Sequence, residues 1–110
     1  MQAIEKKYYS IDEYLQLEEI AEFRSEYHAG KIIPMVGCTP NHNLISGNFY
    51  AALKYALKGK LYRVFMSDLR LWIPASRLYT YPDIIVVTNP LVYAESRRDT
   101  ITNPLIIVEV

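Results

Sequence analysis

The stretch Leu105-Ile106-Ile107-Val108-Glu109-Val110 stands at the end of the chain and decides how the rest is interpreted. It lacks the alternation of apolar and polar side chains that marks a half-buried strand, so the pattern predicts a strand buried on both faces. Glu109 is the exception. Because an isolated carboxylate is costly to bury, such a group shifts its pKa, pairs with a cation or binds a metal ion. Glu109 is therefore the first candidate functional residue.

A second carboxylate opens another β-branched run. Asp83 follows Pro82 and precedes Ile84-Ile85-Val86-Val87. Aspartate is common at turns and strand entries, so Asp83 alone has an ordinary structural explanation. If the two runs form neighbouring strands, however, Asp83 and Glu109 project at the same end of a sheet and offer the hard oxygen ligands that suit Mg²⁺ or Mn²⁺. Such an ion would neutralise Glu109 and could activate water toward a phosphodiester.

Length and composition restrict the class of protein. A chain of 110 residues with 51% hydrophobic content predicts one globular domain and excludes a disordered or fibrous chain. Twelve basic and twelve acidic residues leave no net charge, so any affinity for nucleic acid has to come from a local patch. The single Cys38 excludes an internal disulfide and favours a reducing compartment, for which we expect the cytoplasm.

The two ends of the chain carry further expectations. The segment Met1–Ser10 is polar, without a signal-peptide core, and no apolar run approaches the roughly 18 to 20 residues that span a bilayer. At the other end, the chain stops inside its apolar run without a turn residue or polar tail. We therefore expect no membrane association and a domain that is cut short, with an open sheet edge through which two copies can pair.

The first part of the chain shows clear start and turn signals. Ser10 and Glu13 fit a capping box, which predicts a helix over about residues 11 to 20. Ala29-Gly30 predicts the tight turn of a β-hairpin, because glycine readily supplies a positive φ. Pro34 in the second arm of this hairpin predicts an edge strand.

A second helix is predicted over about residues 41 to 58. Thr39 is a suitable N-cap, Pro40 suits the first helical position, and Gly59 ends the helix. Its predicted inward stripe consists of apolar residues at helical spacing, namely Ile45, Phe49, Ala52, Leu53, Ala56 and Leu57.

The second half of the chain is predicted to be mostly extended. The expected elements are one long strand over 62–73 with a bend near Ser67-Asp68, a loop over 74–80, a return strand over 81–88, a connection over 91–103 that holds a turn of helix, and the last strand. This order predicts an α+β (mixed α/β) domain, with a helix packed on a central and mostly antiparallel sheet.

Several motifs carry a resemblance to a known group of proteins. The segment Tyr81-Pro82-Asp83-Ile84 is followed by Val108-Glu109-Val110, and Glu109 comes 26 residues after Asp83 (109 − 83). This pair resembles the restriction-endonuclease-like PD-(D/E)XK superfamily, and more narrowly its branch of short bacterial endonucleases of unknown substrate. Further segments similar to that branch are Arg24-Ser25-Glu26-Tyr27, Pro40-Asn41-His42, Gly47-Asn48 and Ser67-Asp68-Leu69-Arg70.

The resemblance implies a restriction-endonuclease-like core in which Asp83 and Glu109 hold the metal ion. Glu26 matches a glutamate of the branch and is expected to be a third catalytic carboxylate, against the alternative of an ordinary strand-surface residue. The superfamily places a lysine two residues after the glutamate or on the helix that follows. Here both positions lie past Val110, so we expect the C-terminal helix and strand to be missing and hydrolysis to be impaired.

Other polar residues have structural explanations that we favour. Asp68 and Arg70 are two residues apart on the same face of an expected strand, which predicts an ion pair between them. His42 begins the second helix, where a packed or capping histidine is more common than a catalytic one. With only two histidines and one cysteine, a zinc site is not expected.

The cations Lys54, Lys58, Lys60 and Arg63 form a group that could bind nucleic acid, although such groups usually form only a solvated face. The leading hypothesis is therefore an Mg²⁺- or Mn²⁺-dependent endonuclease that acts on DNA. The alternative is a non-catalytic assembly module, which dimerises through its sheet edge and binds nucleic acid or a protein partner.

Overall fold

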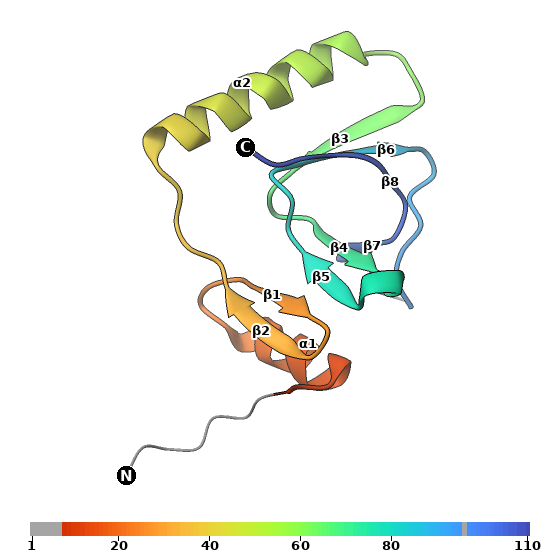
Figure 1. Ribbon diagram of the computed structural model, residues 1–110. Coiled ribbons are helices and arrows are strands. Elements are labelled where there is room, and N and C mark those ends of the chain that lie inside the picture. Colours follow the sequence, from red (N-terminus) through yellow and green to blue (C-terminus); the bar gives the residue numbers. More distant parts are fainter. Residues whose placement is uncertain (1–7, 96) are drawn as a thin grey trace.

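The structure, a computed structural model, describes residues 8–95 and 97–110 (Figure 1). The elements in chain order are α1 (Ile11–Ile20), β1 (Ser25–His28), β2 (Lys31–Pro34), α2 (Pro40–Ala56), β3 (Tyr62–Met66), β4 (Arg70–Ile73), the 3-10 turn η1 (Pro74–Ser76), β5 (Leu78–Thr80), β6 (Ile84–Thr88), β7 (Thr100–Ile101) and β8 (Pro104–Val108).

The strands form two sheets, one with the order β2-β1-β5-β4-β7 and one with the order β3-β6-β8. Within the described residues, β4 and β7 run parallel and the other strand pairs are antiparallel. In Figure 1, α2 lies along the three-stranded sheet, while α1 packs beside the hairpin of β1 and β2. The α+β class and the mostly antiparallel pairing are confirmed, and the expected central sheet is divided in two.

The first helix begins as the sequence predicts. The Glu13 carboxylate accepts a hydrogen bond from the Ser10 backbone N–H (2.8 Å), and the Ser10 hydroxyl accepts one from the Glu13 N–H (3.1 Å). This capping box satisfies two N–H groups that the helix itself leaves unpaired. The helix buries Tyr14 against the rings of Tyr27 and Tyr79. Most of the polar segment Met1–Ser10 lies outside the described residues.

The hairpin of β1 and β2 also agrees with its sequence signals. Its turn places Ala29 at φ 48° and Gly30 at φ 103°. A Cβ atom added to Gly30 would lie 2.9 Å from the Tyr8 ring, so both the backbone angle and the close approach of Tyr8 require glycine. β2, which ends at Pro34, is an edge strand as predicted.

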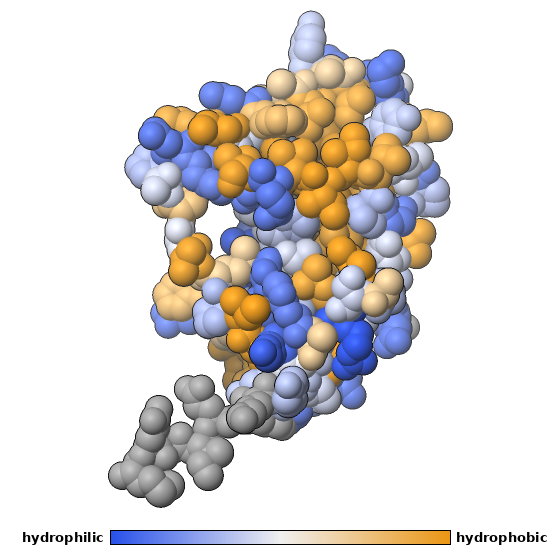
Figure 2. Space-filling view, in the orientation of Figure 1, coloured by the Kyte–Doolittle hydropathy of each residue, from blue (hydrophilic) through white to orange (hydrophobic). Residues whose placement is uncertain are grey.

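The second helix has the predicted start but buries a different face. The Thr39 hydroxyl accepts the His42 N–H (3.1 Å), and Pro40 opens the helix. Tyr50, Leu53 and Leu57 pack on the three-stranded sheet. Of the predicted inward stripe, Ile45, Phe49, Ala52 and Ala56 are instead exposed. The helix carries two neighbouring apolar stripes, and the three-stranded sheet covers only one of them. Figure 2 shows apolar side chains gathered over this part of the molecule.

The long strand predicted over 62–73 is wrong. The chain turns after Met66, so that β3 pairs with β6 (Met66 opposite Ile84) and β4 pairs with β5 (Trp72 opposite Tyr79). The segment 74–80, predicted as a loop, contains η1 and the short strand β5. Because of this turn, residues 62–73 contribute one strand to each of the two sheets. A nearly continuous apolar pattern does not reveal that its two halves belong to different sheets.

The predicted ion pair between Asp68 and Arg70 is also wrong, because the turn separates the two side chains. Asp68 pairs with Arg24 (3.0 Å). Arg70 is buried and pairs with Asp99 (3.0 Å), while also donating to the hydroxyls of Thr100 and Tyr81. The ion pair with Asp99 and the hydrogen bond to Thr100 thus connect β4 to the segment around β7.

The strand buried on both faces is β6 and not β8. Ile85 of β6 is 0% exposed, whereas Ile107, its partner on β8, is 41% exposed. β8 is an edge strand of the three-stranded sheet, so its apolar side chains Leu105, Ile106 and Ile107 remain exposed. The connection before it contains strand β7 among its described residues, where a turn of helix was predicted.

Within residues 8–95 and 97–110, no helix combines the length and the apolar character needed to cross a bilayer.

Candidate active site

The ends of β6 and β8 bring Asp83 and Glu109 together. These strands are antiparallel with Ile84 opposite Val108, so the residues just outside this pair face each other. Asp83 Oδ2 accepts the Val110 N–H (2.8 Å), and Glu109 Oε1 accepts the Asp83 N–H (3.2 Å). The sequence-based expectation that the two carboxylates project at one end of a sheet agrees with this geometry. Glu109 itself lies beyond the strand and is exposed, unlike the buried position first inferred.

Each carboxylate keeps one oxygen available. Among the described residues, no hydrogen bond engages Asp83 Oδ1 or Glu109 Oε2, because the bonds found use Oδ2 and Oε1. The pair is thus held in place by backbone N–H groups while one oxygen of each carboxylate remains free for a ligand.

His42 contacts this pair from the first turn of α2. Its Nε2 lies 3.3 Å from Asp83 Oδ2. The other ring nitrogen, Nδ1, is buried and has no partner among the described residues, and the same holds for the hydroxyl of Ser46 one turn later. Sequence reasoning favoured a packed or capping histidine; Thr39 provides the cap, and the imidazole faces the carboxylate.

Glu26 lies on β1 and lines the same cavity as Asp83 and Glu109. Its Oε1 lies 2.9 Å from His28 Nε2, and its Oε2 accepts the Thr80 hydroxyl. Glu26 is therefore oriented by two neighbours toward the cavity wall, and its charge contributes to the field at Glu109.

The cavity that contains these residues has a volume of about 710 Å³. Its walls come from β1, the segment that follows β2, the first turns of α2 and the end of β3. The residue just before β6 and the residues just after β8 complete them. The polar and charged side chains that line it are Arg24, Glu26, Thr39, His42, Asn43, Ser46, Ser67, Asp83 and Glu109. Elements that are far apart in the sequence thus form one acidic site that is partly shielded from solvent.

Glu109 has a perturbed pKa. Partial burial of its carboxyl group is the largest cause and raises the pKa, and the charges of Asp83 and Glu26 add to this increase. The hydrogen bond from the Asp83 N–H and the neighbouring His42 act in the opposite direction. Crowded carboxylates that disfavour a further negative charge favour the approach of a cation.

The donor set suits a divalent metal ion of the hard type. Mg²⁺ commonly takes one or two carboxylates from the protein and completes its shell with water and substrate phosphate. Asp83 Oδ1 and Glu109 Oε2 fit this requirement. No group of three or more His, Cys, Asp or Glu side chains able to hold a metal ion occurs within the described residues, so a cage made of protein ligands alone is not formed.

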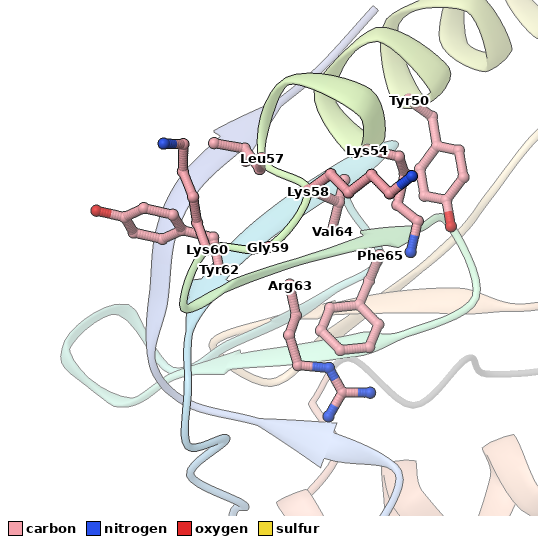
Figure 3. Close-up of a pocket in the computed structure, with 10 residues that line it drawn as sticks. All are labelled: Tyr50, Lys54, Leu57, Lys58, Gly59, Lys60, Tyr62, Arg63, Val64 and Phe65. Atoms are coloured by element: carbon pink, nitrogen blue, oxygen red, sulfur yellow. The ribbon is translucent and has the colours of Figure 1, made fainter.

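The four cations predicted to contact nucleic acid lie away from this cavity. Lys54, Lys58, Lys60 and Arg63 line a separate groove between the C-terminal part of α2 and β3 (Figure 3). The structure therefore groups the predicted carboxylates at one end of α2 and the predicted cations toward the other.

Comparison with known proteins shows the family to which the chain belongs. Residues 11–110 match the Uma2 family, described as "Putative restriction endonuclease". Two curated proteins of Synechocystis are similar: uncharacterized protein sll1609, 40% identical over 98 residues (89% of this chain and 55% of that protein), and uncharacterized protein slr1290, 36% identical over 103 residues (92% and 52%). The chain thus spans about half the length of the curated relatives it matches.

A solved structure shares the fold. It is a crystal structure of a protein from Anabaena variabilis described as a "putative nuclease belonging to DUF820"; the TM-score is 0.63 at 29% identity, over 76% of this chain and 46% of that one. Because the family match covers nearly the whole chain, the protein belongs to the Uma2 family of restriction-endonuclease-like proteins.

Proposed function

We propose that this protein is a divalent-metal-dependent nuclease that cleaves phosphodiester bonds of DNA, with Mg²⁺ or Mn²⁺ held by Asp83 and Glu109. The observation that carries the proposal is the pairing of these carboxylates at the adjoining ends of β6 and β8, each fixed by a backbone N–H and each with a free oxygen. Members of restriction-endonuclease-like families generally use divalent metals, and the donor set here suits such an ion.

The side chains around the pair have assigned roles in this proposal. When bound, the ion would neutralise charge on the phosphate and lower the pKa of a coordinated water. Glu26, which lines the same cavity, serves as the third carboxylate and is kept in position by His28 and Thr80. The free thiol of Cys38 is exposed, which suits the reducing cytoplasm in which we place the enzyme.

The activity is tested by incubating the 110-residue chain with supercoiled plasmid DNA and Mg²⁺ or Mn²⁺. We expect nicking that EDTA abolishes and that either metal restores. Absence of cleavage with both ions, or cleavage that persists in EDTA, would contradict the proposal for this chain.

His42 is expected to act as a positioning residue for the metal site. Side chains that contact metal-binding carboxylates and hold them in position typically contribute about 10- to 100-fold in metal affinity. His42→Ala should therefore weaken Mn²⁺ binding by about tenfold in a calorimetric titration, while His42→Asn, which keeps a polar side chain beside Asp83, should recover part of the loss. Equal affinities for the wild type and both variants would remove His42 from the site.

A second candidate function is an assembly module that dimerises through its sheet edge. It is favoured by one observation, the three exposed apolar residues of the edge strand β8. Sedimentation velocity separates the two candidates: a dimer that Ile106→Lys disperses, without metal binding or cleavage, supports the assembly module.

A further inference from the structure

A cavity separate from the acidic one is a basic and aromatic groove of about 600 Å³. Its walls are the last turns of α2, the turn that follows this helix, and strand β3. In Figure 3, Lys54 from α2 and Lys58 from the turn that follows it extend toward Tyr50, and Arg63 and Phe65 project from β3. Lys60 and Tyr62 lie at the other end. No acidic residue lines this groove, and all its lining residues are among those that the structure describes.

No carboxylate in the part of the chain that the structure describes neutralises the cations of the groove. Lys54, Lys58, Lys60 and Arg63 are exposed, and none of them forms an ion pair with a carboxylate among the described residues. The sequence explains why: no aspartate or glutamate occurs between Glu26 and Asp68. A chain without net charge therefore carries a strongly polarised surface, with unpaired positive charge gathered in one groove.

The helix dipole explains part of this distribution of positive charge. Lysines near the C-terminus of a helix stabilise the negative end of its dipole, which suits Lys54 and Lys58. It does not account for Lys60 and Arg63, which lie further from the end of the helix, with Arg63 on β3. Nor does it account for the aromatic rings in the same groove.

The aromatic rings indicate which anion fits. The Lys54 ammonium lies 5.9 Å from the centre of the Tyr50 ring, and the Arg63 guanidinium 5.4 Å from that of Phe65. Tyr62 keeps 38% of its surface exposed. Cations that follow a phosphate backbone, interleaved with rings on which bases stack, are the features that bind unpaired nucleic acid. In a duplex the base faces are not available for such stacking.

The volume of the groove agrees with an unpaired strand. Sites for small ligands have volumes of roughly 300 to 1,000 Å³, so a groove of about 600 Å³ has room for a nucleotide or two and not for a double helix.

The groove and the acidic cavity lie along one face of α2. Thr39, Asn43 and Ser46 line the cavity, and Tyr50 and Lys54 line the groove. Successive members of this series are three or four residues apart, which keeps them on the same side of a helix. From His42 to Lys54 the helix rises roughly 18 Å, at about 1.5 Å per residue, a span that a short single strand of a few nucleotides covers.

We propose that this groove binds an unpaired stretch of DNA, so that the nuclease engages single-stranded or locally opened substrate a few nucleotides from the bond it cleaves. As a statement about the enzyme's substrate, the inference rests on the proposed function. The binding itself uses none of the metal-site carboxylates, so it can be measured separately.

The test is fluorescence anisotropy in EDTA, with a labelled oligothymidylate of roughly 20 nucleotides and a duplex of the same length. We expect the single strand to bind at least tenfold more tightly than the duplex. Because EDTA removes any divalent ion, binding in this assay reports on the groove without the metal site, which separates failure of the groove from failure of the metal site. Equal affinity for both probes, preference for the duplex, or no binding would overturn the proposal.

Charge reversal in the groove has a matched control on the rest of the surface. Lys58→Glu with Arg63→Glu should weaken single-strand binding at least tenfold and reduce the salt slope by about 1.4, since each lost phosphate contact on a single strand contributes roughly 0.7. Lys31→Glu with Arg98→Glu makes the same change in net charge at exposed positions outside the groove. Equal losses in the two double variants would overturn the proposal.

Stacking has its own pair of variants. Tyr62→Ala should weaken binding by roughly 5- to 100-fold, the usual range for loss of one base-stacking ring. Tyr55→Ala, on the exposed surface of α2 and outside the groove, should have little effect. Thermal unfolding of every variant shows that the fold is retained, and equal affinities of the two tyrosine variants would contradict the assigned role of Tyr62.

Discussion

Asp83→Asn is expected to reduce metal-dependent DNA cleavage by at least a hundredfold, which corresponds to about 2.7 kcal/mol of transition-state stabilisation. The substitution removes the charge but keeps the shape, and the amide oxygen can still accept the Val110 N–H that Asp83 Oδ2 now accepts. Loss of a metal ligand removes both the neutralisation of the phosphate and the activation of water, effects that are each worth several kcal/mol. Glu109→Gln should cause a loss of similar size.

The matched control is Asp68→Asn. Asp68 is also an aspartate in a turn beside the cavity, but its side chain is 96% exposed and pairs only with Arg24 among the residues that the structure describes. Its substitution should change the rate of DNA cleavage by no more than about twofold to threefold, which corresponds to roughly 0.5 kcal/mol of activation free energy. Gel-based nicking assays and circular dichroism of the three variants provide the comparison. Similar rates for Asp83→Asn and Asp68→Asn would exclude the assigned site.

Ile85→Ala is expected to cause the largest loss of stability. Ile85 is fully buried in a cluster with Leu71, Val87 and Ile101. Replacing such an isoleucine by alanine removes apolar contacts and leaves a cavity, at a cost of about 2 to 5 kcal/mol. For a domain of this size, that corresponds to a decrease in Tm of roughly 10 to 25 °C.

The partner residue across the strand pair provides the control. Ile107 lies opposite Ile85 on β8 but keeps 41% of its surface exposed. Ile107→Ala should therefore cost about 1 kcal/mol or less, because little apolar area returns to water. Thermal and urea unfolding of both variants tests the different burial of β6 and β8. Equal losses would show that β8 is as deeply buried as its apolar sequence first indicated.

These two strands also show what a sequence can and cannot reveal. The runs 84–87 and 105–108 are almost equally apolar, so local pattern predicts burial for both. Their difference comes from position, since β6 is the central strand of its sheet and β8 is at the edge. In the same way, the apolar residues of α2 do not reveal which face of the helix is covered, because the placement of the sheet decides it.

Features that depend on a few neighbouring residues were predicted correctly. The capping box at Ser10, the glycine turn at Gly30 and the N-cap at Thr39 each follow from local hydrogen bonding or backbone angles. The convergence of Asp83 and Glu109 was also foreseen, because residues outside the ends of paired strands have to meet.

His42 was undervalued because its role depends on long-range placement. Nothing in the sequence near His42 shows that the start of α2 lies beside the end of β6, where Nε2 lies 3.3 Å from Asp83 Oδ2. The bend near Ser67-Asp68 was predicted, but the division of residues 62–73 between two sheets was missed for a related reason, since both sheets draw on one apolar stretch. Contacts between distant segments account for most of what the sequence did not predict.

The central claim, that Asp83 and Glu109 together hold a divalent metal ion, is tested most directly by isothermal titration of Mn²⁺ into the wild-type chain and the Glu109→Gln variant. We predict saturable binding at about one ion per chain, with affinity lowered by at least roughly tenfold in the variant. The same isotherm for both proteins, or no binding by the wild type, would contradict the claim.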